Sequence, residues 1–328
     1  MTVAALASPA GAADSAAIVM YHRFGEDQYP STNVRIEQFE AHVAELESGR
    51  YTVLPVPEIV EALRAGRSLP DRAIGITIDD AYRSVYTVAF PRLKAAGLTF
   101  TIFIATDDVD KKLPGSLTWD QIREMRDAGV TIGAHSASHL HMPEATPETN
   151  RQEMQRSLRR FEQELGARPT LFAYPYGEMS LAVQKVVAEF GFKTAFGQHS
   201  GTAHRVGDPY YIPRFALNET YSGLDDFILR VNTVGLPVRD LTPSDPYLAQ
   251  GNPPLIGFTV DDSVPSLAGL SCYHSQLGTV APEILGTHRV ELRFSEPFPA
   301  GRTRLSCTRP AGGGRWYWFG MQYVVPTD

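Results

Sequence analysis

Apolar runs alternate with amphipathic helical segments over the first two thirds of the chain. The runs are rich in β-branched and aromatic residues, which predicts strands at 17–22, 74–78, 100–104, 130–134, 171–174 and 194–196. Between these runs, apolar residues recur at the spacing of a helix face, as at Met154, Leu158, Phe161 and Leu165. Strand–helix alternation of this length predicts an α/β fold, with a parallel sheet covered by helices that is open or closed into a barrel.

Capping residues mark where several of the helices begin. Thr118 with Gln121 three residues later is typical of a capping box that opens a helix. Thr146, which is followed by a proline, and Ser180 predict the starts of two further helices. Another helix is predicted over 86–96, where the apolar spacing is again helical.

The pattern changes near Gly235, where helical periodicity stops and prolines become frequent. Strand-like runs follow at 256–260, 288–294, 303–307 and 316–325. The three glycines at 312–314 predict a turn between the last two runs. We therefore expect a small all-β, β-sandwich-like domain over 236–328, after a first domain over 14–235.

The C-terminal segment leaves two alternatives open. The aromatic run 316–319 either exposes one face that binds sugar rings, which would make the domain carbohydrate-binding, or fills the core of the sandwich. The two cysteines, Cys272 and Cys307, form either one disulfide or two free buried thiols.

The N-terminal residues 1–13 are small and mostly apolar, and they include Ala10-Gly11-Ala12. Small residues in this arrangement fit a signal-peptidase cleavage site. We interpret the segment as the remnant of an export signal, or as a disordered N-terminus, and expect it to lie outside the fold. A periplasmic or secreted protein is the corresponding expectation.

Composition narrows the possible partners. Hydrophobic residues make up 43% of the chain and charged residues 20%, which is ordinary for a soluble globular protein. The formal net charge of -7 disfavours nucleic acid as a partner. No apolar run is long enough to span a membrane.

Two acidic and two imidazole side chains follow predicted strands. Asp79 and Asp80 come directly after the run 74–78, and His135 and His139 come after the run 130–134. The carboxyl ends of parallel strands meet at one edge of the sheet, so these side chains should converge there. Two histidines and one carboxylate complete a three-ligand metal face, and the second carboxylate remains free to take a proton from water.

Each half of this constellation has another interpretation. A pair of aspartates after a strand is commonly a helix N-cap, and a His-x-x-x-His pair alone is often structural. Their joint occurrence at strand ends favours metal-assisted hydrolysis. Two histidines and one carboxylate also suit a non-haem iron oxygenase, but that chemistry has no use for the additional Asp79.

Three motifs, in this order, resemble the polysaccharide deacetylases, carbohydrate esterase family 4, also called the NodB-homology domain. The family's Thr-Phe-Asp-Asp appears as Thr-Ile-Asp-Asp at 77–80, and its His-Ser/Thr-x-x-His appears at 135–139. Its Arg-x-Pro-Tyr is altered to Ala-Tyr-Pro-Tyr at 173–176. The resemblance covers about residues 16–220, and it is strongest to the branch of poly-N-acetylglucosamine deacetylases because of Tyr21-His22 and the segment 174–177.

The resemblance implies a fold and a set of roles. The fold would be a distorted (β/α) barrel with fewer than eight repeats. Asp80, His135 and His139 would hold the metal, usually Zn²⁺ or another divalent transition metal. Asp79 would be the base that activates water, and the backbone N–H of Tyr176 would stabilise the oxyanion.

Two groups of the family are missing from their usual places. The third-motif arginine, which orients the catalytic base, is Ala173 here, and we propose Arg214 as its substitute. The late Leu-x-His motif that supplies the general acid is absent from the sequence, and His199 is the candidate replacement. His141, close after the second motif, is interpreted as a surface or supporting group.

The sequence thus predicts metal-dependent hydrolysis of acetyl groups from an acetylated polysaccharide or oligosaccharide, most simply a polymer of N-acetylhexosamine. Substrate is expected to contact Tyr174, Pro175, Tyr176 and His22. The alternatives are a catalytically degenerate carbohydrate-binding protein, which the altered third motif favours, and an O-acetyl esterase of the xylan type from the same family.

Overall fold

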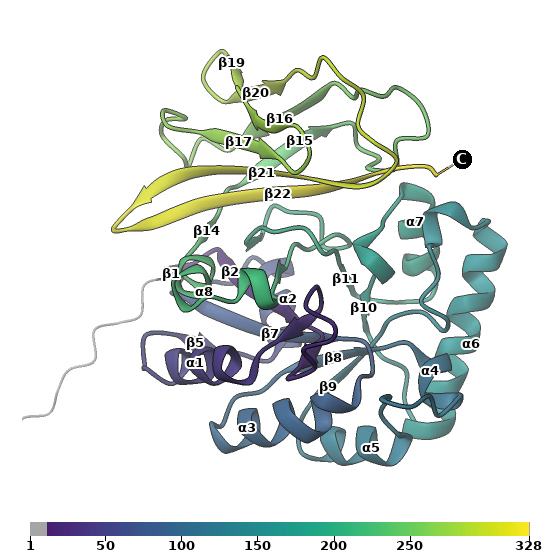
Figure 1. The fold of residues 1–328 in the computed structure, drawn as a ribbon. Coiled ribbons are helices and arrows are strands. Elements are labelled where there is room, and N and C mark those ends of the chain that lie inside the picture. The colour runs from purple at the N-terminus through teal and green to yellow at the C-terminus, as the bar shows by residue number, and fades with distance from the viewer. Residues whose placement is uncertain (1–11, 328) are drawn as a thin grey trace, which may run out of the picture.

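The computed structural model describes residues 12–327, and its first part is a parallel half-barrel surrounded by helices (Figure 1). Neighbouring strands follow the order β11-β10-β9-β8-β7-β2, and all of these pairs are parallel. The half-barrel confirms the predicted α/β fold. Its strands are β2 (Ser15–Tyr21), β7 (Ala73–Asp79), β8 (Thr101–Ile104), β9 (Thr131–Ala134), β10 (Leu171–Ala173) and β11 (Thr194–Phe196). Short strands at its margins are β5 (Thr52–Val53), β12 (Ala203–His204) and β13 (Phe215–Ala216).

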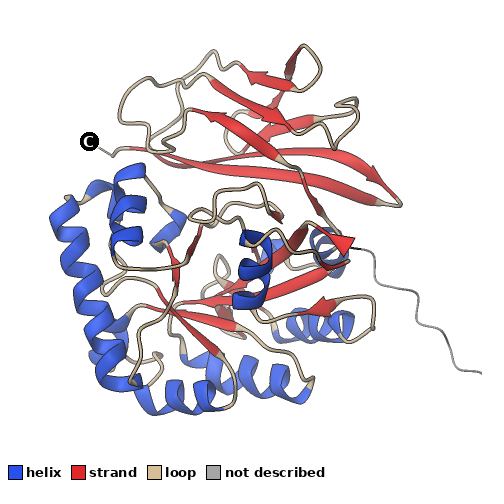
Figure 2. Ribbon diagram, turned by 180° about the vertical axis from the view of Figure 1, so that it is seen from behind, coloured by secondary structure: helices blue, strands red, loops and turns tan. Residues whose placement is uncertain are grey.

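Helices cover the outside of the sheet (Figure 2). Every residue of β2 and β7 is buried. Continuous burial of this kind is typical of parallel strands. Thr77 is the one hydroxyl within Ala73–Asp79, and it donates a hydrogen bond of 2.7 Å to the carbonyl of Val19. The strand β7 therefore carries Asp79 to the rim on a rigid support.

The helices begin where the capping residues predict. The Thr118 side chain accepts from the Gln121 backbone N–H, and the Gln121 side chain accepts from the Thr118 backbone N–H, which confirms the capping box. Thr146 and Ser180 also cap their helices. The helices are α1 (Ile36–Leu46), α2 (Val56–Arg64), α3 (Phe90–Ala95), α4 (Thr106–Asp110), α5 (Trp119–Asp127), α6 (Pro147–Leu165), α7 (Leu181–Glu189) and α8 (Leu224–Val231).

The helix predicted over 86–96 is not uniform. A π-helical turn at Val85–Ala89 precedes α3. Pro91 stands at the junction and has no N–H to donate, so it cannot continue an ordinary helical ladder from the preceding turn. A wider turn before the proline accommodates it.

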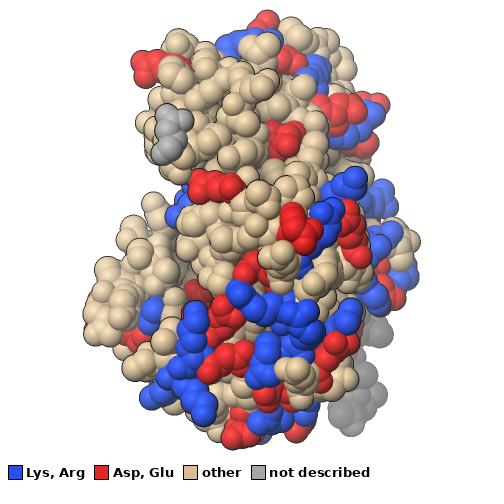
Figure 3. Space-filling model, turned by 90° about the vertical axis from the view of Figure 1, so that its right-hand side faces the viewer, with Lys and Arg blue, Asp and Glu red and all other residues tan. Residues whose placement is uncertain are grey.

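The outer face of the half-barrel carries both signs of charge in close mixture (Figure 3). Arg160 pairs with Asp110 at 2.7 Å, and Arg123 pairs with Glu164 at 2.8 Å. Exposed pairs of this kind each contribute about 0–1 kcal/mol to stability. They are typical of solvated helix faces. Because both signs of charge are mixed, neither positive nor negative charge dominates this face.

Strand-rich sheets follow the half-barrel, as predicted. One sheet contains β14 (Val234–Gly235), β17 (Ser271–His274), β18 (Gly278–Val280), β21 (Gly301–Gly312) and β22 (Arg315–Val325). The other contains β15 (Val238–Thr242), β16 (Ile256–Val260), β19 (Glu283–Leu285) and β20 (Arg289–Leu292). The long β21–β22 hairpin lies against the half-barrel (Figure 1). The glycines at 312–314 make its turn with positive φ angles, which suits residues without a Cβ.

The aromatic run 316–319 is used mainly for packing. The ring of Trp318 packs edge to face against Phe215 of the half-barrel, with 5.2 Å between the ring centroids. The ring of Phe319 packs against Phe258, with 5.0 Å between the centroids. Trp316 remains 37% exposed. The run therefore joins the two parts of the protein, and a carbohydrate-binding role for the C-terminal segment stays a prediction.

Cys272 and Cys307 form a disulfide between β17 and β21, which decides the alternative that the sequence left open. The export signal was predicted over residues 1–13, of which residues 1–11 lie outside the described residues. Ala12–Ala13 form β1 and pair with β6 (Leu69–Pro70), so the expectation that residues 1–13 lie wholly outside the fold is wrong for these two alanines.

Across residues 12–327, no helix combines the length and the apolar character needed to cross a bilayer.

His42 makes the stability of the half-barrel depend on pH. Its ring is buried, Tyr21 donates to Nδ1 at 3.0 Å, and Nε2 donates to the Ser222 carbonyl at 3.0 Å. Burial lowers the pKa of His42 to about 4. His42 therefore becomes protonated near pH 6.5 in the unfolded chain but only near pH 4 in the folded chain. As the pH drops from about 6.5 to 4, this difference lowers the free energy of unfolding by up to about 3 kcal/mol.

We expect His42→Asn to be less stable than the wild type at pH 7 and to show a weaker loss between pH 7 and 5. Urea unfolding at a series of pH values measures both slopes. The other buried histidines contribute equally to both proteins, so the difference isolates His42. Parallel stability curves for the two proteins would show that His42 is not responsible.

Candidate metal centre and catalytic site

Turns in the left-handed region bring the site residues together at the carboxyl edge of the sheet. Asp79 is the last residue of β7, and Asp80 follows with φ of 64°. His135 follows β9 directly, and His139 has φ of 58°. Such angles are costly for residues with a Cβ and cluster at functional sites. At Asp80 the turn sends two consecutive carboxylates in different directions.

Asp80, His135 and His139 form a compact cluster, called here the Asp–His–His cluster. Oδ1 of Asp80 lies 3.6 Å from Nε2 of His135 and 3.5 Å from Nε2 of His139. One ligand atom from each residue lies within 4.8 Å of the others. The sequence prediction that these three residues converge is confirmed by their geometry.

His135 is already in the form that a metal ligand needs. Its Nδ1–H donates to the Ala173 carbonyl at 2.7 Å, which leaves the lone pair on Nε2. Within residues 12–327, that Nε2 is buried without a hydrogen-bond partner. Burial also lowers the pKa of His135 to about 3, so the ring is neutral. A buried acceptor without a donor is rare in folded proteins, and a divalent cation in the cluster would satisfy it.

Asp79 is separate from the cluster and is paired with Arg214. Nη1 and Nη2 of Arg214 donate to the two Asp79 oxygens at 2.6 and 2.7 Å, and both side chains have no exposed surface. Arg214 Nε also donates to the Gly197 carbonyl at 2.9 Å. Burial by itself would raise the pKa of Asp79, but the Arg214 cation outweighs it and holds the pKa at about 2. Asp79 is thus a fixed carboxylate, and Arg214 lies where a substitute for the missing arginine is expected.

Removal of the Arg214 charge should be strongly destabilising. In Arg214→Met, Asp79 would be a buried carboxylate without a counter-ion, and we expect a loss of about 3–5 kcal/mol. The double variant Arg214→Met/Asp79→Asn should recover part of that loss because no buried charge remains. Chemical denaturation of the four proteins of this cycle measures the coupling. Additive losses would show that the pair contributes no interaction energy.

The segment after β10 places one tyrosine at the cavity and two residues behind it. Tyr176 has φ of 57°, lies edge-on to His139 at 4.3 Å and lines the cavity. Tyr174 and Pro175 are buried and do not line it. The expectation that Tyr174 and Pro175 contact substrate is therefore wrong, because the chain turns at Tyr176 and presents only that side chain. They position Tyr176 from behind.

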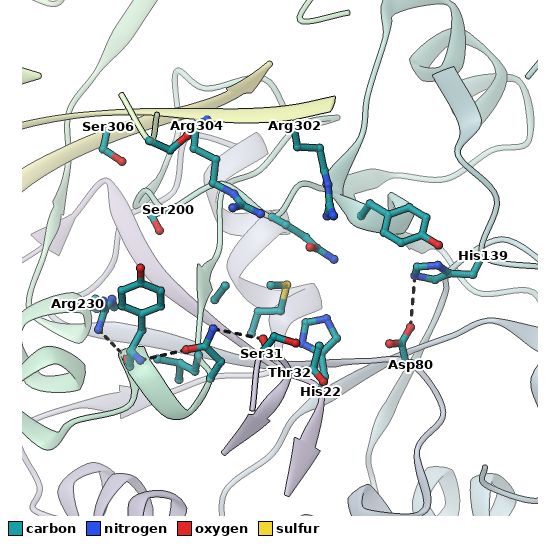
Figure 4. Close-up of a pocket in the computed structure, with 18 of the residues that line it drawn as sticks. His22, Ser31, Thr32, Asp80, His139, Ser200, Arg230, Arg302, Arg304 and Ser306 are labelled. Carbon is teal, nitrogen blue, oxygen red and sulfur yellow. Dashed lines mark hydrogen bonds and ion pairs between the residues drawn. The ribbon is translucent and has the colours of Figure 1, made fainter. Parts of the chain in front are cut away.

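A cavity of about 880 Å³ extends from the Asp–His–His cluster (Figure 4). Asp80 and His139 lie at one end, and His22 lines the wall beside them, as predicted. A volume in this range is ordinary for a ligand site. Asp108 also lines the cavity. Sequence analysis did not assign Asp108 to the site, although it lies in α4, which begins shortly after β8 ends.

His199 does not reach this cavity. Gln198 and Ser200 line the cavity, whereas His199 between them faces a separate cavity of about 460 Å³ and packs on Tyr211 at 4.5 Å. Successive residues of an extended segment point to opposite sides, which explains the placement. Burial lowers the pKa of His199 to about 3. A buried neutral imidazole outside the cavity cannot protonate a leaving group there, so the assignment of His199 as general acid is not carried further.

His141 and the C-terminal strands complete the surroundings of Tyr176. The His141 ring stacks on Tyr176 at 3.9 Å, and its Nδ1 lies 2.8 Å from Glu178. The C-terminal segment contributes Tyr273, Ser275, Arg302, Arg304 and Ser306 to the cavity. Sequence analysis did not assign these residues to the site.

The parallel half-barrel with its covering helices resembles the fold of the carbohydrate esterase family 4 deacetylases. Residues 66–195 match the model of the family named polysaccharide deacetylase. This segment of the chain is therefore a polysaccharide deacetylase domain.

Two relatives also match the chain in sequence. YxkH of Bacillus subtilis, provisionally named a polysaccharide deacetylase, is 29% identical over 206 residues, which are 63% of this chain and 72% of that protein. The poly-beta-1,6-N-acetyl-D-glucosamine N-deacetylase of Staphylococcus aureus is 24% identical over 199 residues, covering 57% and 68%.

Two solved structures share the half-barrel. The deacetylase PplD of Streptococcus pyogenes, in complex with acetate, superposes with a TM-score of 0.62 at 21% identity and covers 66% of this chain and 98% of that one. IcaB of Ammonifex degensii gives 0.60 at 22% identity, with 67% and 98% covered. These likenesses concern the fold.

Proposed function

We propose that this protein is a metal-dependent deacetylase that hydrolyses acetyl groups of an acetylated carbohydrate, with N-acetylhexosamine units as the leading candidates. The observation that carries the proposal is that two adjacent aspartates have different partners. Asp80 belongs to the Asp–His–His cluster, and Asp79 is held as a free carboxylate by Arg214. The family match of residues 66–195 and the S. aureus relative support the same reaction and substrate class.

Asp80, His135 and His139 would hold the cation, and the mixed oxygen and imidazole donors suit Zn²⁺ or another divalent transition metal. A divalent cation held by these residues would supply Lewis-acid chemistry, which would lower the pKa of water and polarise the acetyl carbonyl. The lone pair on His135 Nε2 and the buried Ala173 carbonyl on the other side of that ring are the local features that fit this role.

The chain's own groups perform the proton transfers. Asp79 accepts the proton of the attacking water, and Arg214 keeps that carboxylate ionised and oriented. A carboxylate of low pKa does not retain the proton, so Asp79 can return it to the amine nitrogen as the C–N bond breaks. The backbone N–H of Tyr176 donates to the developing oxyanion.

A carbohydrate-binding protein without activity is the main rival. The altered third motif favours it, but the Asp79–Arg214 pair restores the interaction that Ala173 cannot make. An O-acetyl esterase of the same family would use the same residues on a different leaving group.

A substrate panel separates these functions. The Zn²⁺-loaded protein is incubated with N-acetylglucosamine oligomers of two linkages and with acetylated xylan, and released acetate is quantified. We expect acetate from the N-acetylated oligomers and its loss after chelation. Acetate from xylan alone would identify an O-acetyl esterase. Binding of oligomers without acetate release would refute the deacetylase.

We also propose that the protein acts outside the cytoplasm. The Cys272–Cys307 disulfide supports this because such bonds persist in oxidising compartments. Fractionation of the producing cells, followed by thiol labelling, tests it. Recovery of the protein from the cytoplasm with two labelled thiols would contradict it.

A further inference from the structure

Strand β21 forms the wall of the cavity that faces the Asp–His–His cluster (Figure 4). Arg302, Arg304 and Ser306 line the cavity, whereas the intervening Thr303 and Leu305 are fully buried in the C-terminal sheets. This alternation is the ordinary geometry of a strand with one packed face. It places two guanidinium groups of one strand on the same side, directed into the cavity.

Two of the three arginines that line the cavity already have acidic partners. Arg302 lies 3.6 Å from Glu178, and its guanidinium also lies over the ring of Tyr176, 5.2 Å from the centroid. Arg230 lies 3.9 Å from Asp226. The charges of these two side chains are compensated within the protein.

Arg304 has no such partner. Among residues 12–327, no carboxylate lies within ion-pair distance of its guanidinium, and its side chain makes no hydrogen bond. The side chain is accessible from the cavity, but the surrounding walls partly dehydrate it. Desolvation by these walls, together with the nearby Arg302 cation, lowers the pKa of Arg304. A guanidinium in this position has all of its donors free for an incoming anion.

We propose that Arg304 binds an acidic group of the substrate, so that the protein acts on an anionic acetylated glycan. The inference rests on the proposed deacetylase function and specifies its substrate. The recognised group is an oxyanion, a carboxylate or a phosphate, because both accept two parallel hydrogen bonds from a guanidinium. The acetylated sugar lies at the Asp–His–His cluster, and the acidic group lies further along the same cavity, at β21.

The competing explanation is that Arg304 binds neutral hydroxyl or amide oxygens. Ligands that are matched except for charge decide between the two. Hyaluronan hexasaccharide, which alternates a carboxylate-bearing sugar with an N-acetylhexosamine, is compared with the same oligosaccharide after reduction of its carboxylates to alcohols. N-acetylglucosamine 6-phosphate is compared with N-acetylglucosamine as the phosphate arm.

Affinities are measured by calorimetry on the full-length Zn²⁺-loaded protein carrying Asp79→Asn, which prevents turnover. We expect at least one anionic ligand to bind about tenfold or more tightly than its neutral partner, as a charge-assisted hydrogen bond predicts. In Arg304→Gln that ratio should approach one. Arg309→Gln removes an arginine of the same strand outside the cavity, and its ratio should match the parent protein. The arm that shows the preference identifies carboxylate or phosphate.

Equal affinities within both pairs, or no measurable binding of either anionic ligand, would overturn the inference. A preference that survives Arg304→Gln would overturn it as well. Acetate release from neutral N-acetylglucosamine oligomers by the wild type tests the deacetylase function separately. Acetate release without tighter binding of the anionic ligands would support the deacetylase function and refute only the anionic substrate. Tighter binding of the anionic ligands without acetate release from any acetylated ligand would support the anion site and refute the deacetylase function.

Discussion

Asp79→Asn should abolish acetate release while the metal remains bound. The amide has the shape of the carboxylate but cannot accept a proton from water, so the loss should be about 10²–10⁴-fold in kcat. Asp79 lies outside the Asp–His–His cluster, so metal content should stay near one ion per chain. Acetate assays combined with metal analysis of the same sample measure both quantities.

Asp80→Asn is the matched control for this experiment. It makes the same chemical change one residue further along the chain, and we expect it to lose both the metal and the activity. Arg214 would retain only a neutral partner in Asp79→Asn, so circular dichroism and a melting curve must show that the variant is folded. A folded Asp79→Asn protein that deacetylates at the wild-type rate would eliminate Asp79 as the base.

His135→Ala should lose the metal. His135 supplies the buried Nε2 of the cluster, and only two of the three side chains would remain. We expect affinity for Zn²⁺ to fall by at least about 100-fold, a loss as large as those caused by removing groups that merely orient ligands. Competition with a chromophoric chelator measures the affinity without any assay of activity.

His141→Ala controls for the removal of an imidazole from the same loop. His141 pairs with Glu178 and stacks on Tyr176, outside the cluster, so this variant should keep its Zn²⁺ affinity. If His135→Ala bound Zn²⁺ as tightly as the wild type, the proposed ligand set would be wrong. Equal losses in the two variants would indicate that the loop, and not the ligand, was disturbed.

The Asp–His–His cluster could be predicted because local patterns determine its position. Apolar runs mark the strands, parallel strands end at a common edge, and Asp80 and His135 follow such runs immediately. Arg214 was proposed as the partner of Asp79 because Ala173 replaces the arginine of the family's third motif, and the two residues are paired although they lie far apart in sequence. The sequence could not predict the bidentate geometry of the Asp79–Arg214 pair, because that geometry depends on how β13 lies beside β2.

The prediction for His199 failed for a reason that strand periodicity explains. The residue follows a strand, but position after a strand does not fix the side to which the side chain points. Gln198 and Ser200 occupy the cavity side, so His199 must face the other way. Tyr174 shows the same limit, because it too follows the rim pattern and is nevertheless buried behind Tyr176.

The arginines of β21 were missed because sequence patterns describe each domain separately. The alternation of Arg302, Thr303, Arg304 and Leu305 predicts a strand with one polar face, but it does not tell what that face meets. Packing of the β21–β22 hairpin against the half-barrel, through Trp318 and Phe215 among others, turns this face toward the cluster. Contacts between distant parts of the chain are the information that periodicity lacks.

The most direct test of the central claim is an anomalous difference map from crystals of the Zn²⁺-loaded protein, recorded on both sides of the zinc edge. The account predicts one peak at about 2.0–2.2 Å from Nε2 of His135, Nε2 of His139 and an oxygen of Asp80, with Asp79 still paired to Arg214. A zinc ion bound by Asp79, or no peak at the cluster under saturating zinc, would contradict it.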